Sequence, residues 1–165
     1  MRTRLGLAAV AVTLAAAFMA GPAGAEERKC RGTINAVTVD NLRVPHGATC
    51  TLNRTKVKGT VKVERGATLK ATAIRVIGNV QAEGAAKVSV TASKVGGSVQ
   101  IVQGRSSTLG QTSVKGDVQY FENRGAIAIT SNRVDGNLQC KENTRRPTGG
   151  GNVVQGNKED QCSQL

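Results

Sequence analysis

The chain has 165 residues, enough for one domain, and carries 23 Lys and Arg against 11 Asp and Glu, a formal charge of +12. Aromatic residues make up only 2% of the chain and Trp is absent, which argues against an aromatic-rich core and against a flat stacking platform for sugars or single-stranded bases. A strongly basic chain commonly meets an anionic partner, although the same charge also serves solubility.

Residues 1–25 have the pattern of a secretory signal peptide. Two arginines precede the apolar run LGLAAVAVTLAAAFMA, and AGA at 23–25 supplies the small-x-small cleavage pattern. We expect cleavage near Ala25 and a protein that is secreted, extracellular or associated with the cell envelope. The remaining 140 residues keep 21 basic and 11 acidic side chains, a formal charge of +10. No later segment is apolar for 18 residues, so no transmembrane anchor is expected.

The mature chain repeats the motif V-x-G at intervals of 19 or 20 residues. Its valine recurs at Val57, Val76, Val95, Val114, Val134 and Val154, and its glycine at Gly59, Gly78, Gly97, Gly116, Gly136 and Gly156. Apolar and polar residues alternate within each unit, which is the period of a β-strand. Short strands bury their apolar face only by stacking, at roughly 4.8 Å per strand, so the repeat predicts an all-β, single-stranded parallel β-helix solenoid.

This solenoid would occupy residues 26–165 as one β-helix domain. We expect an N-terminal capping coil over 30–53, regular coils over 54–142 and a C-terminal cap over 143–165. The valines would form an inward column, and each glycine would sit at a corner where a Cβ atom would crowd or strain the turn. The alternative is an antiparallel barrel of hairpins, but hairpins do not require identical residues to recur at one fixed interval.

The four cysteines of a secreted chain are expected to form two disulfides. Cys30 and Cys50 lie 20 residues apart at one end, and Cys140 and Cys162 lie 22 apart at the other. Residues one coil apart are roughly 5 Å apart in space, within the span that a disulfide accepts. We therefore predict Cys30–Cys50 and Cys140–Cys162 as disulfides that fasten each end. A zinc site is disfavoured because C-x-x-C is absent and His46 is the single histidine, so no metal or cofactor is expected.

The V-x-G-x-V units, with forms such as VKGDVQ, resemble the coils of bactofilins, the bacterial polymer-forming β-helix proteins, over residues 54–140. That resemblance implies a right-handed β-helix. Bactofilins are cytoplasmic scaffolds, whereas this chain has a signal peptide and cysteines, so their filament role does not carry over. The tail GNLQCKENTRRPTGGGNVVQGNKEDQC at 136–162 resembles the end of small secreted bacterial repeat proteins of largely uncharacterised function.

Residues for catalysis are sparse. Asp117 and Asp135 are the Asp residues within the regular coils, and they fall in different columns, so they are expected to be solvated surface rather than a facing acid–base pair. His46 lies beside Pro45 and Gly47 and is expected on a turn. We therefore predict no catalytic residues and no enzymatic activity. A polysaccharide-active hydrolase or lyase is kept as a further alternative.

Two outward columns are prominent in the repeat. One consists of Gln81, Gln100, Gln119 and Gln139, headed by Lys62, and is expected to be a structural stack of hydrogen-bonded amides. The other precedes each motif valine and consists of Lys56, Arg75, Lys94, Ser113 and Arg133. Its like charges would either splay into water or lie against an anionic polymer.

From these columns we predict a structural or adhesive protein at the cell surface. The hypothesis is that Lys56, Arg75, Lys94 and Arg133, with Lys58 and Lys62 nearby, bind an acidic polysaccharide or cell-wall polymer by electrostatic attraction. No specific nucleic-acid partner is expected. The alternative function is a surface scaffold that assembles end to end.

Overall fold

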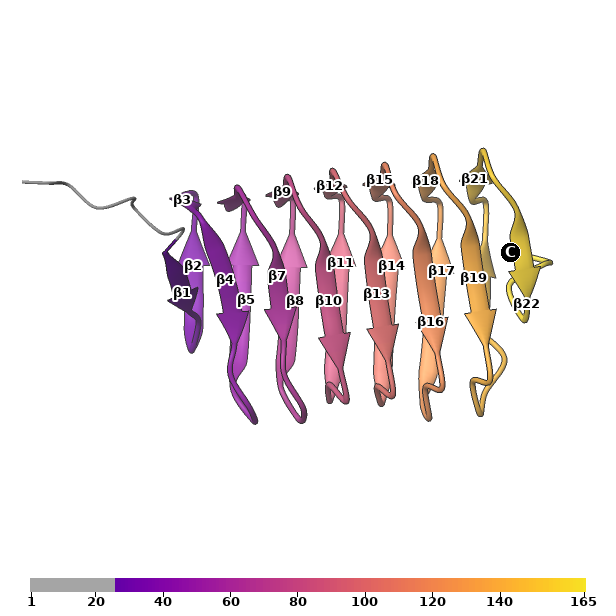
Figure 1. Ribbon diagram of the computed structural model, residues 1–165, viewed down its shortest axis with the longest axis horizontal. Coiled ribbons are helices and arrows are strands. Elements are labelled where there is room, and N and C mark those ends of the chain that lie inside the picture. Colours follow the sequence, from indigo (N-terminus) through magenta and orange to yellow (C-terminus); the bar gives the residue numbers. More distant parts are fainter. Residues whose placement is uncertain (1–25) are drawn as a thin grey trace, which may run out of the picture.

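The structure, a computed structural model, describes residues 26–165; the predicted signal peptide at 1–25 lies outside the described residues. The described chain consists of 22 short strands joined by turns and bends, and it contains no helix. All strand pairs are parallel, so the chain forms a parallel β-solenoid of about seven turns, seen as a straight rod in Figure 1. The predicted fold class is confirmed, and the hairpin barrel is wrong because no antiparallel pair occurs among these strands.

Each turn of the solenoid contributes one strand to each of three sheets. Sheet A contains, in spatial order, β1 (Glu27–Lys29), β4 (Asn41–Val44), β7 (Val61–Val63), β10 (Val80–Glu83), β13 (Val99–Val102), β16 (Val118–Phe121), β19 (Leu138–Lys141) and β22 (Lys158–Asp160). Sheet B contains β2 (Gly32–Asn35), β5 (Thr49–Asn53), β8 (Thr68–Thr72), β11 (Lys87–Thr91), β14 (Ser106–Gly110), β17 (Ala126–Thr130) and β20 (Thr148–Gly150). Sheet C contains the two-residue strands β3 (Thr38–Val39), β6 (Lys56–Val57), β9 (Arg75–Val76), β12 (Lys94–Val95), β15 (Ser113–Val114), β18 (Arg133–Val134) and β21 (Val153–Val154).

The register of sheet C confirms the predicted valine column. Each motif valine is the direct register partner of the next. None of these valines is more than 2% exposed, and they are Val57, Val76, Val95, Val114 and Val134. The interior is otherwise filled by Val, Leu, Ile and Ala, with Tyr120 as the one fully buried aromatic residue among residues 26–165. Valine suits these positions because its branched side chain fills a narrow space between β-strands at little rotamer cost.

The motif glycines lie at the corner between sheets C and A, and crowding is the reason for glycine there. A Cβ atom built on Gly78 would lie 2.7 Å from the carbonyl oxygen of Gly59 one coil before. None of these glycines has a left-handed φ. Left-handed residues occur at the other two corners instead, as at Arg54 (φ 50°) and Gln103 (φ 56°).

Buried polar side chains supply hydrogen bonds at the corners that the short strands leave open. At the corner between sheets B and C, the Thr112 N–H donates to Asn132 Oδ1 (2.9 Å) and the Asn132 N–H donates to Asn152 Oδ1 (3.0 Å). A second stack, containing Asn123 and Asn143, repeats this pattern between sheets A and B. Because a buried backbone N–H without a partner is costly, these amides stabilise the turns.

The two predicted disulfides are confirmed at the two ends of the rod. The Cα atoms of Cys30 and Cys50 are 5.5 Å apart, and those of Cys140 and Cys162 are 5.2 Å apart. Each bond joins an end coil to its neighbour, and all four cysteines are buried. A closed loop of about 20 residues is worth on the order of 3 kcal/mol in the chain-entropy model, so the disulfides hold the coils that have only one neighbour.

Candidate functional site

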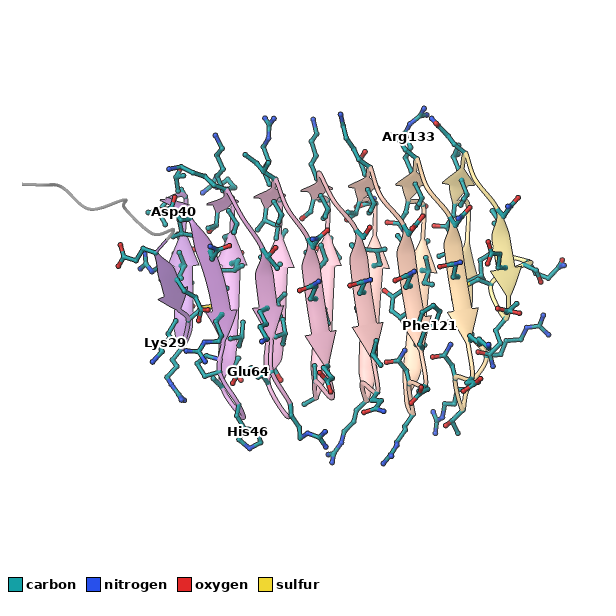
Figure 2. The ribbon with its side chains drawn as sticks, in the orientation of Figure 1. Lys29, Asp40, His46, Glu64, Phe121 and Arg133 are labelled. Carbon is teal, nitrogen blue, oxygen red and sulfur yellow. A yellow bond between two sulfur atoms is a disulfide. The ribbon has the colours of Figure 1, made fainter. Side chains whose placement is uncertain are left out.

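The predicted basic row lies on the narrow edge of the rod that sheet C forms. The Cα register pairs Lys56 with Arg75 and Arg75 with Lys94, and then continues through Ser113 to Arg133. The four cationic side chains are exposed. Figure 2 shows Arg133 at this edge, in a series of side chains that project away from the rod. The strands are two residues long, with the valine inward, so the preceding residue necessarily points outward.

Neighbouring carboxylates divide this edge into paired and unpaired cations. Asp135 Oδ1 lies 3.7 Å from Arg133 Nε, and Asp40 Oδ1 lies 3.0 Å from Lys58 Nζ. By contrast, Lys56, Arg75 and Lys94 take part in no ion pair within residues 26–165. These three residues, which follow one another in the register and which we call the basic row, therefore have charge to offer a ligand.

The hypothesis also grouped Lys58 and Lys62 with the row, and the structure places these two residues on different sides of the glycine corner. Lys58 lies on the same edge, in the next outward column, together with Lys115, which the binding hypothesis did not include. Both occupy the x position of V-x-G, and that shared position could have identified them together. Lys62 instead lies on β7 of sheet A, beyond the glycine corner. It is near the row in sequence but on a different face, so the structure does not bring it to the row.

Sheet A carries the predicted glutamine stack. Nε2 of each glutamine donates to Oε1 of the next, with distances of 3.2 Å from Gln81 to Gln100, 2.7 Å from Gln100 to Gln119 and 2.8 Å from Gln119 to Gln139. The last amide donates to Glu159 Oε2 at 2.8 Å. The stack therefore runs from Lys62, the register partner of Gln81, to a carboxylate at the opposite end.

The two Asp residues of the coils do not face each other. Asp117 Oδ1 accepts the backbone N–H of Asn137 (2.8 Å), and Asp117's own N–H donates to Ser98 Oγ (3.1 Å). Asp117 is half-buried, and its carboxylate also belongs to the hydrogen-bonded column of the glycine corner. Asp135 pairs with Arg133 on the sheet C edge. His46 lies on the turn after β4, as expected (Figure 2).

Within residues 26–165, no cluster of three or more His, Cys, Asp or Glu side chains is arranged to hold a metal ion. The same residues include no helix that is long and apolar enough to cross a membrane.

Burial raises the pKa of Tyr120 to about 12, but its hydroxyl faces the interior, where Ser107 Oγ lies 3.2 Å away.

Comparison of the chain with protein-family models, with curated proteins and with solved structures finds no match. The interpretation of the basic row therefore depends on the geometry and charge of the described residues.

Proposed function

We propose that the protein is a secreted, non-enzymatic solenoid that binds an acidic polysaccharide or cell-wall polymer along its sheet C edge. The observation that carries this proposal is the basic row, in which Lys56, Arg75 and Lys94 occupy one outward position in three successive coils and have no ion-pair partner among residues 26–165. Strands in a sheet are roughly 4.8 Å apart, so the row presents cations at short, regular steps along the rod axis.

The row costs the isolated protein some stability. Two unit charges about 5 Å apart in water repel each other by about 0.8 kcal/mol, and exposed side chains reduce this cost by splaying apart. A polyanion laid along the edge would remove the repulsion and release its own counterions, as polyanions do when cations neutralise them. The same physics predicts binding that weakens steeply with salt, because exposed charges are screened over about 8 Å at physiological ionic strength.

The test compares two triple variants with the same change in charge. In the row variant Lys56, Arg75 and Lys94 become Gln; in the control variant Lys70, Lys87 and Arg124, which are exposed on other faces, become Gln. Retention on heparin and on polygalacturonate columns is measured across a salt series. We expect the slope of log K against log salt to fall by roughly two to three units for the row variant and by less than one for the control.

Thermal melting accompanies the retention measurement. The row variant should melt at the parent's temperature or slightly higher, since a repulsion is removed and no contact is lost. If both triple variants lose retention equally, net charge alone governs binding and the row is not a binding site. A row variant that is retained as strongly as the parent contradicts the proposal directly.

End-to-end assembly, the alternative function, is opposed by the residues at the two ends. The inward column of Leu and Val in sheet A has a cation at each end. Arg28 on β1 is the register partner of Leu42, and Lys158 on β22 is the register partner of Leu138. A stacked second copy would bring these two cations together at an apolar position. Inward charges on terminal strands are a known means of preventing edge-to-edge growth, so we propose that the protein does not polymerise through its ends.

A further inference from the structure

Sheet A contains an open recess of about 570 Å³ near its N-terminal half. Its polar lining comes from two cations, two carboxylates and two amides of the glutamine stack, namely Lys62, Arg65, Glu64, Glu83, Gln81 and Gln100. This face is separated from the basic row by the glycine corner, so an inference about it does not rest on the function proposed above.

The recess lies where the turn between sheets A and B changes its conformation. In the coils of β4 and β7 the left-handed residue, Gly47 or Gly66, comes three residues after the last inward valine. From β10 onward it comes two residues after the inward residue, as at Gly84 and Gln103. The turns after β4 and β7 extend further than the turn after β10 (Figure 1). Glu64 and Arg65, at the start of the turn after β7, line the recess together with Glu83 at the end of β10.

One of the carboxylates at the recess is already committed to the protein. Glu64 Oε2 accepts the His46 backbone N–H at 2.9 Å, and Glu64 Oε1 lies 3.1 Å from Arg43 Nη1. These two contacts, the His46 N–H first, lower the pKa of Glu64. Figure 2 shows Glu64 and His46 together at this edge of the rod. Glu64 therefore stays ionised, and it shares Arg43 with Glu27, which pairs with the Arg43 Nε.

Three charged groups that line the recess have no ion-pair partner within residues 26–165, and they are two cations and one carboxylate. Lys62 and Arg65 have no ion-pair partner in the described part of the chain, and neither has Glu83. The Arg65 stem lies against Gly84, because a Cβ atom on this glycine would be 3.2 Å from Arg65 Cγ. Arg65 is also one of the residues that line the recess. Lys62 and Arg65, which have no ion-pair partner among the described residues, can therefore hold one carboxylate of a ligand, while Glu83 and Glu64 disfavour a second negative charge.

The amides add fixed donors and acceptors to this charge pattern. The hydrogen bond from Gln81 to Gln100 and the bond from Gln100 to Gln119 hold both carboxamides in place. Each carboxamide has two N–H groups and an oxygen with two lone pairs, so each retains capacity for a ligand after bonding within the stack. Groups that both donate and accept suit hydroxyls, which also do both.

We propose that this recess binds one uronic acid residue of a glycan. Its carboxylate lies between Lys62 and Arg65, one hydroxyl donates to Glu83, and other hydroxyls exchange hydrogen bonds with Gln81 and Gln100. A carboxylate is favoured over a phosphate because Glu83 repels a second negative charge, while it accepts a hydrogen bond from a sugar hydroxyl. The site would give sugar selectivity, which a row of exposed cations does not provide.

The test follows the side-chain amide signals of the ¹⁵N-labelled protein by NMR during titration with trigalacturonate. We expect the signals of Gln81 and Gln100 to shift in a saturable manner, and that of Gln139, at the far end of the stack, to stay in place. Lys62→Gln combined with Arg65→Gln should weaken binding at least tenfold. The row variant, with Lys56, Arg75 and Lys94 changed to Gln, should keep these shifts, which separates the recess from the row.

Two ligand controls and one further variant make the outcome decisive. Galactose and inorganic phosphate should each leave the Gln81 and Gln100 signals unchanged at concentrations where trigalacturonate saturates. Glu83→Gln, which removes the repelling charge, should let phosphate bind. The proposal is overturned if galactose or phosphate shifts the wild-type signals as trigalacturonate does, or if the Lys62 and Arg65 double variant, melting like the parent, keeps full affinity.

Discussion

Replacing one motif glycine tests why the repeat requires glycine. In Gly78→Ala the new methyl group would lie 2.7 Å from the Gly59 carbonyl oxygen and 2.9 Å from the Gly59 carbonyl carbon. Both are backbone atoms of the adjacent coil, which move only if the strand spacing at that corner increases. Overpacking of this kind costs about 1–3 kcal/mol, so the melting temperature should fall by roughly 3–10 °C.

Gly110→Ala is the matched control for this substitution. Gly110 lies on β14 with an outward position, and the atoms nearest to a methyl group placed there would be 3.8 Å away, ordinary van der Waals contact. Its φ is not left-handed. Alanine there restricts the unfolded chain and should be neutral or stabilise by about 0.4–1 kcal/mol.

Far-UV circular dichroism melts of the two glycine variants and the parent, with disulfides intact, make the comparison. The expected order of melting temperature is Gly110→Ala at or above the parent and Gly78→Ala clearly below it. If Gly78→Ala melts with the parent, the close approach of the coils at the glycine corner is not what selects glycine.

Three further perturbations follow from burial and charge. Val95→Asp places a charge in the inward column and should destabilise by roughly 3 kcal/mol or more, whereas Lys94→Asp, one residue along and exposed, should change stability by less than about 0.5 kcal/mol in urea unfolding. The pKa of Tyr120, about 12, is raised above its unfolded value near 10, so its contribution to stability is complete below pH 10. Stability should then fall by about 1.4 kcal/mol per pH unit between pH 10 and 12 as the unfolded chain ionises first, and Tyr120→Phe should lack that component of the slope. Arg28→Val combined with Lys158→Val should form longer species in analytical ultracentrifugation; a double variant that sediments like the parent would show that these end charges do not prevent stacking.

The coil, the inward column and the disulfides could all be predicted from the order of the amino acids. Each coil repeats the previous one one step further along the rod, so residues 19 or 20 apart occupy the same position in successive coils. The pairs Val57–Val76 and Cys30–Cys50 could therefore be predicted by counting residues. Lys56, Arg75 and Lys94 were placed in one row by the same count, and the register confirms that placement.

The repeat does not say which side of the rod each position of a coil faces, because that depends on the three-dimensional path of the chain. Lys62 is six residues after Lys56, yet it faces another side because the chain turns a corner at Gly59. Lys58 and Arg133 are paired with acids, and only side-chain distances reveal which cations remain unpaired.

The recess on sheet A likewise could not be predicted from the interval of the repeat. Gly66 and Gly84 are 18 residues apart, and the left-handed conformation moves by one residue between their two coils. The repeat records which residues stack, because stacking has the same geometry in every coil. The path of each turn depends on local backbone dihedrals and on neighbours in the adjacent coils, and these decide which faces and recesses the rod presents.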